Sequence, residues 1–146
     1  MKDIIRYGIV GIGGMGGNHA NLFLQNKIKN GSLEAICDTN DEFAKNFPNI
    51  PFYKEVDNFF EAVMCVGTFT FGHVKPPALD EFIRITKNKG LICFTINEGI
   101  HEEYGFDKKI AQLNIDNKWK EIEFFKSDYI ASKDVNAWLG LYEVIK

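Results

Sequence analysis

The sequence YGIVGIGGMGGNHANLF, residues 7–23, is the strongest indication of the fold of this chain. An apolar run of strand length, residues 4–12, leads into a cluster of glycines, and an amphipathic segment, residues 17–31, follows the cluster. A strand, a glycine turn and a helix in this order are typical of the first unit of a parallel α/β sheet. Gly11, Gly13 and Gly16 fit the spacing G-x-G-x-x-G, with the strand before it and the helix after it.

The rest of the chain continues the alternation of apolar runs and amphipathic stretches. Further strands are expected at residues 32–38, 51–55, 62–67 and 91–96, and further helices at 40–47, 56–62, from Pro76 to before Gly90, and at 106–117. Residues 119–130 and 136–146 read as two more strands, and the five residues between them are too few for a helical crossover. We therefore expect a single-domain, three-layer Rossmann-like α/β sandwich over residues 1–146. Its sheet is mostly parallel, in the order 3-2-1-4-5-7-6, and ends in an antiparallel hairpin.

Composition and charge exclude several classes of protein. The 146 residues carry a net charge of −3 without a dense basic run, so nucleic-acid binding is not expected. No apolar run reaches the length of a membrane span, and the N-terminus does not read as a signal peptide. Cys37, Cys65 and Cys93 each lie in an apolar run without a CxxC spacing, which is typical of free buried thiols in the cytoplasm. We expect a cytoplasmic monomer or weak homodimer.

The glycine turn predicts a site for a nucleotide cofactor. Gly11 permits a tight turn, Gly13 leaves room for a pyrophosphate, and Gly16 lets the helix pack closely on the strand. Free N–H groups and the positive end of the helix dipole would then face the phosphates. Asp38, 22 residues after Gly16, ends the second predicted strand, where a carboxylate accepts from ribose hydroxyls. Because it would repel the 2′-phosphate of NADP, NAD is the preferred cofactor. A glycine-rich turn without a ligand is the alternative.

The predicted cofactor site lies at the carboxyl edge of three neighbouring strands. Its residues are Gly11, Ile12, Gly13, Gly14, Met15 and Gly16 after the first strand, Asp38 and Thr39 after the second, and Val66, Gly67 and Thr68 after the fourth.

Other side chains near this edge allow both a functional and a simpler structural interpretation. His73, in the loop after the fourth strand, could approach a nicotinamide or an adenine, but a loop histidine satisfied by backbone or water is the more common case. Phe69 and Phe71 either line an adenine pocket or lie exposed. Glu98 follows the strand at 91–96, where a group facing a substrate would lie, but an acidic loop is usually only solvated. No spacing predicts a metal site or a nucleophile–base pair.

Residues 1–61 resemble a known family. The segments IIRYGIVGIGGMGGNHA, LEAICDTN and FYKEVDNFFE are similar to the N-terminal Rossmann part of Gfo/Idh/MocA NAD(P)-dependent oxidoreductases. The resemblance implies that the backbone around Ile12, Gly13 and Met15 holds a pyrophosphate and that Asp38 holds the adenosine ribose. The catalytic Glu-Lys-Pro of that family is absent, and no residues remain for its second domain. Hydride transfer is therefore not expected.

Residues 62–146 resemble a different family. The segments VMCVGTFTFGHVKPPALDEFIRITKNKGLICFTINEG, WKEIEFFKSDYI and NAWLGLYEVIK are similar to the C-terminal half of a class I S-adenosylmethionine-dependent methyltransferase, closest to the methyltransferase-like proteins of the Williams–Beuren region. The Lys-x-x-Gly at Lys87–Gly90 and the terminal hairpin carry this resemblance. The glycine motif of that family, acidic-x-G-x-G-x-G, is absent. S-adenosylmethionine, bound through Asp38 and the loop after residues 62–67, is thus the alternative cofactor.

Two family resemblances in one chain are most simply explained by an engineered chimera, and a natural protein with an eroded second half is the alternative. The predicted function is an NAD-binding Rossmann domain without catalytic activity. One alternative is an S-adenosylmethionine-binding, methyltransferase-like protein, and another is a folded scaffold without a ligand.

Overall fold

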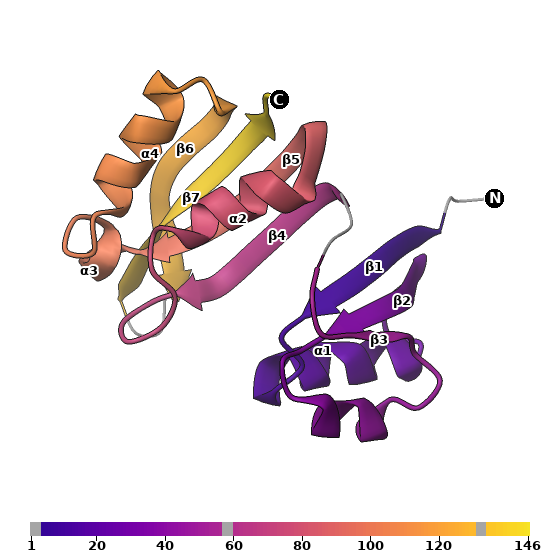
Figure 1. Cartoon of the computed structure of the whole chain (residues 1–146). Coiled ribbons are helices and arrows are strands. Elements are labelled where there is room, and N and C mark those ends of the chain that lie inside the picture. Colours follow the sequence, from indigo (N-terminus) through magenta and orange to yellow (C-terminus); the bar gives the residue numbers. More distant parts are fainter. Residues whose placement is uncertain (1–3, 57–59, 131–133) are drawn as a thin grey trace. The chain divides into compact units, whose positions relative to one another are not determined.

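The computed structural model describes residues 4–56, 60–130 and 134–146 (Figure 1). The chain divides into two compact units, which we call unit 1 (Met1–Asp57) and unit 2 (Asn58–Lys146). Each unit has its own sheet and its own core of buried side chains. The division falls close to residue 61, where the two sequence resemblances meet. The expectation of one domain over the whole chain stays a prediction.

Unit 1 is a small parallel α/β unit. Its elements are β1 (Ile5–Val10), α1 (Gly14–Leu24), β2 (Gly31–Cys37), the 3₁₀ helix η1 (Asp41–Asn46) and β3 (Phe52–Tyr53). The strands pair in the order β1-β2-β3, and both pairings are parallel. Apolar side chains from the turn, the helix and β2 form the core, together with Phe47. The order 3-2-1 expected for these strands is confirmed within unit 1.

Helix α1 is shorter than the predicted segment 17–31. It begins at Gly14 and ends at Leu24, since Asn26 adopts a left-handed backbone conformation with φ of +53°. The N–H of Lys27 then donates to the carbonyl of Leu22, which closes the last turn. Asparagine tolerates this conformation better than most residues. Gly31 consequently begins β2 instead of ending the helix.

Unit 2 combines a parallel strand pair with the predicted hairpin. Its elements are β4 (Phe60–Phe69), α2 (Ala78–Ile85), β5 (Thr86–Asn97), α3 (Glu98–His101), α4 (Phe106–Ile115), β6 (Trp119–Ile130) and β7 (Val135–Val144). The strands pair in the order β4-β5-β7-β6, with β4 parallel to β5 and the other pairs antiparallel. The short helix predicted at 56–62 is wrong from Phe60 onward, where β4 begins, and residues 57–59 lie outside the described residues.

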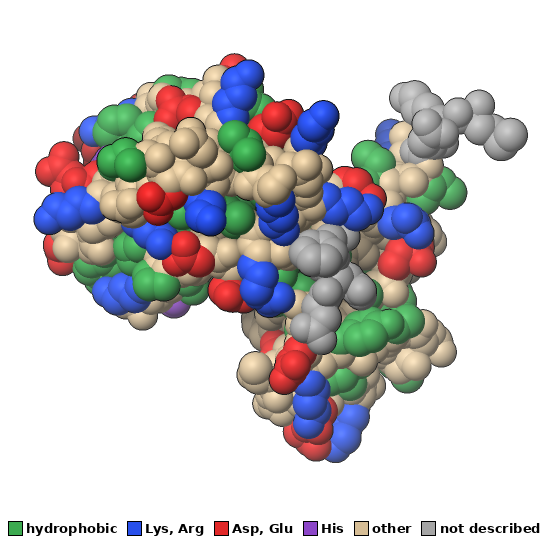
Figure 2. Space-filling view, turned by 45° about the horizontal axis from the view of Figure 1, so that its top comes forward, with side chains coloured by type: hydrophobic (Ala, Val, Ile, Leu, Met, Phe, Trp, Pro, Cys, Tyr) green, Lys and Arg blue, Asp and Glu red, His purple; other side chains and the backbone are tan. Residues whose placement is uncertain are grey.

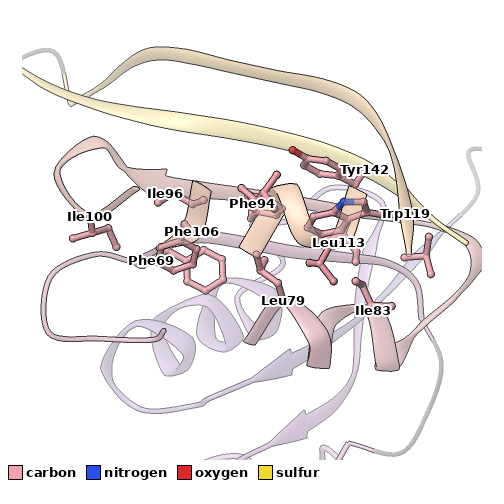
Figure 3. Close-up of a cluster of buried hydrophobic side chains, with 13 residues drawn as sticks. Phe69, Leu79, Ile83, Phe94, Ile96, Ile100, Phe106, Leu113, Trp119 and Tyr142 are labelled. Carbon is pink, nitrogen blue, oxygen red and sulfur yellow. The ribbon is translucent and has the colours of Figure 1, made fainter. Parts of the chain in front are cut away.

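The core of unit 2 lies between its sheet and the helices α2 and α4 (Figure 3). Ile92, Phe94 and Ile96 project from one face of β5, because side chains two apart share a face of a strand. Leu79 and Ile83 of α2 are buried in the same core. Phe69 is also part of this core, 1% exposed, so it lines no pocket.

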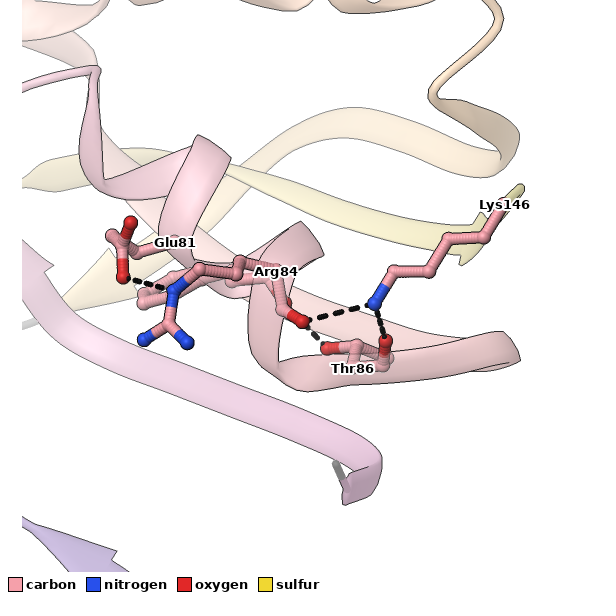
Figure 4. Close-up of polar contacts among 5 residues, drawn as sticks. Glu81, Arg84, Thr86 and Lys146 are labelled. Atoms are coloured by element: carbon pink, nitrogen blue, oxygen red, sulfur yellow. Dashed lines mark hydrogen bonds and ion pairs between the residues drawn. The ribbon is translucent and has the colours of Figure 1, made fainter. Parts of the chain in front are cut away.

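Helix α2 ends at Ile85, earlier than predicted, because β5 begins directly at Thr86. The hydroxyl of Thr86 donates to the carbonyl of Phe82, and the Lys146 ammonium donates to the carbonyls of Arg84 and Thr86 (Figure 4). These donors satisfy carbonyls that the end of a helix leaves without partners. The first part of β5, at Lys87–Gly90, is irregular, with Lys89 at a φ of +63°.

The structure is thus a mixed α/β protein with one parallel and one mixed sheet, a Rossmann-like architecture. The adjacency of β1 and β4 in the expected seven-strand order stays a prediction. In the part of the chain that the structure describes, no helix is long and apolar enough to cross a membrane. The three cysteines are free thiols; Cys37 is buried, and Cys65 and Cys93 are half-buried.

Candidate functional site: the glycine turn and Asp38

The glycine turn connects β1 to α1 in unit 1. Gly11 has a φ of +83°, a conformation that favours glycine, and its N–H donates to the carbonyl of Cys37 at 2.8 Å. A Cβ added to Gly16 would lie 1.7 Å from the carbonyl oxygen of Gly11. Gly16 is therefore needed for the close packing of α1 against the turn, as its spacing predicts.

Asp38 follows the last residue of β2 and is bound to the glycine turn. Its Oδ2 accepts a hydrogen bond from the N–H of Ile12 at 2.8 Å, and its Oδ1 accepts one from the N–H of Asn40 at 2.9 Å. The two bonds hold the carboxylate in one orientation beside the turn. Each carboxylate oxygen has a second lone pair, so both can still accept from hydroxyl groups of a ligand.

The outer side of the turn is open. A Cβ added to Gly11, Gly13 or Gly14 would meet no atom within 4 Å. The side chain of Met15 is 70% exposed. Thr39, next to Asp38, is exposed as well. Unit 1 therefore brings together all the predicted site residues from positions 11–16 and 38–39, with space for a ligand beside them.

The predicted residues Val66, Gly67 and Thr68 lie in unit 2, in an irregularity of β4. Cys65 pairs with Phe94 and Phe69 with Ile96, so three residues of β4 lie opposite one residue of β5. Gly67 has a φ of +77°, and its N–H donates to the Thr95 hydroxyl at 2.9 Å. Bulges of this kind are frequent beside functional sites.

The role of Thr95 was not predicted, although a threonine within an apolar strand is a visible signal. Thr95 is 6% exposed, and its hydroxyl accepts from a glycine 28 positions earlier in the chain. A buried hydroxyl of this kind needs a hydrogen-bond partner. The hydrogen bond therefore links the side chain of Thr95 to the conformation of the bulge.

Glu98, the first residue of α3, contacts residues of β6 and β7 instead of standing free in solvent. Its carboxylate lies 2.5 Å from the Lys126 ammonium of β6 and accepts from both the N–H and the side-chain amide of Asn136 in β7. The hydrogen bond from Lys126 lowers the pKa of Glu98. The expectation of a merely solvated acid is therefore wrong. The carboxylate of Glu98 connects α3 to the strands β6 and β7.

Surface charge and thiol chemistry limit what these units do chemically. Acidic and basic side chains are interspersed on the face that Figure 2 shows, without a basic field. Burial raises the pKa of the Cys37 and Cys65 thiols, so both are poor nucleophiles at neutral pH. The arrangement thus favours binding through backbone N–H groups and one carboxylate over thiol catalysis.

Comparison with known proteins identifies the fold. No protein-family model and no curated protein sequence matches the chain. Among solved structures, the N-methyltransferase NodS from Bradyrhizobium japonicum WM9, in complex with S-adenosyl-L-homocysteine, is 10% identical over 99% of this chain and 80% of its own, with a TM-score of 0.57. A putative class I S-adenosylmethionine-dependent methyltransferase from Listeria monocytogenes is 10% identical over 99% of this chain and 55% of its own, with a TM-score of 0.59.

A third similar structure is a putative rRNA methylase from Clostridium thermocellum. It is 19% identical over 97% of this chain and 91% of its own, with a TM-score of 0.51. The three similarities reach from the first to the second unit of the chain. They support the methyltransferase resemblance of residues 62–146. They do not support the oxidoreductase resemblance of residues 1–61.

These findings correct the predicted function. The predicted cofactor NAD and the predicted lack of catalytic activity are wrong, because the similar structures are methyltransferases and one of them holds S-adenosyl-L-homocysteine. The hypothesis of a chimera or designed protein has no support either, since single methyltransferase structures match nearly the whole chain. The chain has the fold of class I S-adenosylmethionine-dependent methyltransferases.

Proposed function

We propose that the chain binds S-adenosylmethionine at the glycine turn and Asp38 of unit 1, and that it is a methyltransferase. The observation that carries this proposal is the carboxylate of Asp38, held beside the turn by the N–H groups of Ile12 and Asn40. A carboxylate at the end of the second strand of a Rossmann-like sheet suits the two hydroxyls of a ribose. The fold similarity supplies the rest of the support.

The residues of the turn suit an adenosine-type ligand in other respects. The open side of Gly11, Gly13 and Gly14 lets a ligand approach the backbone. Met15 adds an exposed apolar side chain at the first turn of α1, a neighbour better suited to the aliphatic part of a methionine chain than to a phosphate. S-adenosylmethionine, when bound, supplies the methyl group on its sulfonium. A role in binding for Val66, Gly67 and Thr68 of unit 2 stays a prediction.

The methyl acceptor proposed is a small molecule. A nucleic-acid acceptor calls for a basic surface that neutralises phosphates. This chain has a net charge of −3, and charges of both signs are interspersed on the face that Figure 2 shows. Similar structures include a putative rRNA methylase, but also an N-methyltransferase.

Calorimetric titration of the purified chain with S-adenosylmethionine and S-adenosyl-L-homocysteine tests this proposal. Both are expected to bind, and Asp38→Ala should weaken them about 10- to 100-fold, the worth of hydrogen bonds to a charged group. Glu34→Ala is the matched control, an exposed carboxylate on β2 that should leave the affinity unchanged. The proposal fails if neither ligand binds, or if Asp38→Ala binds both as well as the unaltered chain.

A further inference from the structure

Two aromatic rings meet near a right angle in unit 2. Phe71 lies in the loop after β4 and Tyr104 between α3 and α4, with ring centroids 6.0 Å apart and planes at 78°. The Tyr104 hydroxyl accepts from the N–H of Gly72 at 3.2 Å. A Cβ added to Gly99 would lie 2.8 Å from the Phe71 ring, so this ring rests on the backbone of α3. Both rings are thus held in place.

A cation already lies on one of these rings. The ammonium of Lys75 is 3.2 Å from the centroid of the Tyr104 ring, well within the range of a cation–π interaction. Pro76 follows Lys75 and restricts its backbone, and the N–H of Ala78 donates to its carbonyl at 3.1 Å. Over residues 4–56, 60–130 and 134–146, no carboxylate forms an ion pair with Lys75. Its contact with the aromatic face is therefore not a by-product of a salt bridge.

The surroundings favour a positive charge and leave it reachable. Glu102 and Glu103 precede Tyr104 and are exposed, so the segment that carries this ring also carries two negative charges. Phe71 is 52% exposed and Lys75 is exposed. The long side chain of lysine changes rotamer freely at a surface. A cation from solution can thus compete with Lys75 for the ring.

We propose that Phe71 and Tyr104 form a site for an organic cation of the quaternary ammonium class, which Lys75 occupies from within the chain. The face of the Tyr104 ring that Lys75 covers suits a cation whose charge is spread over methyl groups, and Phe71, edge-to-face with that ring, adds apolar contact beside it. This site does not depend on the proposed methyltransferase function, since all its residues lie in unit 2 and no cofactor takes part.

Occupation by Lys75 has a measurable consequence. The apparent dissociation constant of an external cation equals its intrinsic value divided by the fraction of molecules with a free ring. Removing the lysine ammonium raises that fraction to one. Lys75→Gln should therefore bind the cation more tightly than the unaltered chain does. The gain in affinity is about threefold if Lys75 covers the ring in two thirds of the molecules, and it is larger if Lys75 covers the ring in a larger fraction.

Saturation-transfer NMR with choline as the probe tests the site, at constant ionic strength and without cofactor. Its neutral isostere, 3,3-dimethylbutan-1-ol, controls for apolar contact. The variants are Lys75→Gln, the double variant Lys75→Gln with Tyr104→Leu, and Lys75→Gln with Phe71→Leu. Lys108→Gln is the matched control, an exposed lysine on α4. Thermal unfolding of each variant verifies that it is folded, and Phe71, being half-exposed, serves as the second ring variant if Tyr104→Leu does not fold.

The expected result is weak choline binding to the unaltered chain, tighter binding to Lys75→Gln, unchanged binding to Lys108→Gln, and loss of binding in either folded ring variant. Three results would overturn the proposal. They are an unchanged or weaker affinity in Lys75→Gln, equal binding of choline and its neutral isostere, and choline binding that survives the loss of a ring.

Discussion

The backbone N–H of Ile12 donates a 2.8 Å hydrogen bond to Oδ2 of Asp38, 26 positions further along the chain. This bond joins the glycine turn after β1 to the end of β2. The second carboxylate oxygen accepts from Asn40, so one side chain satisfies backbone donors on both sides of the candidate site. The same carboxylate that would bind a ribose therefore also stabilises unit 1.

Asp38→Ala should consequently lower the stability of the protein as well as its affinity for S-adenosylmethionine. Two backbone N–H groups lose their acceptor, and the expected cost is about 1–3 kcal/mol in the free energy of unfolding. Asp38→Asn keeps one acceptor oxygen and should cost less. Urea unfolding of both variants, beside Glu34→Ala, measures these differences. Equal stability of Asp38→Ala and the unaltered chain would mean that the two hydrogen bonds do not contribute.

Two glycines of the turn should differ sharply in their tolerance of alanine. Gly16→Ala places a Cβ 1.7 Å from the carbonyl oxygen of Gly11, so α1 must move away from the turn, at an expected cost above about 3 kcal/mol. Gly14→Ala points its Cβ into open space at the start of the helix and should cost less than about 0.5 kcal/mol. Chemical denaturation compares the two. Similar costs would contradict the close approach at Gly16.

The bulge in β4 should depend on Gly67. Gly67→Ala forces a left-handed conformation on a residue with a Cβ, which costs about 1–2 kcal/mol, and that Cβ would lie 2.9 Å from the Tyr129 hydroxyl. Tyr129→Phe removes the hydroxyl alone. In a double-variant cycle measured by thermal unfolding, it should recover the part of the loss that comes from this contact. Strictly additive effects would exclude the contact between the two residues.

Stability should fall in mild acid because of His101. Its ring is 8% exposed and stacks on Trp138 at 4.8 Å, and among the described residues its Nε2 has no hydrogen-bond partner. Burial lowers the pKa of His101 below its ordinary value of 6.5, although Asp107 and Glu102 act in the opposite direction. Between the lowered folded pKa and 6.5 the unfolded chain binds more protons. The stability present above this window is therefore lost as the pH falls through it.

His101→Phe keeps a stacked ring without a titratable group. Denaturant unfolding at several pH values between about 7.5 and 5 should give a smaller decrease for this variant than for the unaltered chain. Equal pH dependence of the two proteins would show that another group is responsible.

Local signals in the sequence predicted a large part of the fold. The β6 strand over 119–130 and its antiparallel partner follow from long β-type runs and a short connection, and the structure has both. The helix predicted at 40–47 is present as η1, and Asn40, a residue type that favours this position, caps it by accepting from the N–H of Glu42. The end of α1 was missed because Asn26 takes a left-handed conformation, which its residue type permits but does not require.

The candidate site was predictable only where its residues lie at the end of strands. Asp38 and the glycine turn follow from spacing, because parallel strands bring their carboxyl ends to one edge. Two contacts join residues that lie far apart in the chain, so no local sequence pattern predicts them. They are the hydrogen bond from Gly67 to Thr95 and the cation–π contact of Lys75 with Tyr104. The prediction of NAD as the cofactor was wrong because a glycine turn followed by an acidic residue binds more than one kind of nucleotide cofactor.

Changes in the amide chemical shifts of the ¹⁵N-labelled chain locate the proposed S-adenosylmethionine site. On addition of S-adenosyl-L-homocysteine, the largest shifts are expected at the amides of Ile12, Gly13, Gly14 and Asn40, which surround the Asp38 carboxylate and the open turn. These shifts should saturate and should be absent in Asp38→Ala. An unchanged spectrum, or shifts confined to residues away from the turn and Asp38, would contradict the proposed site.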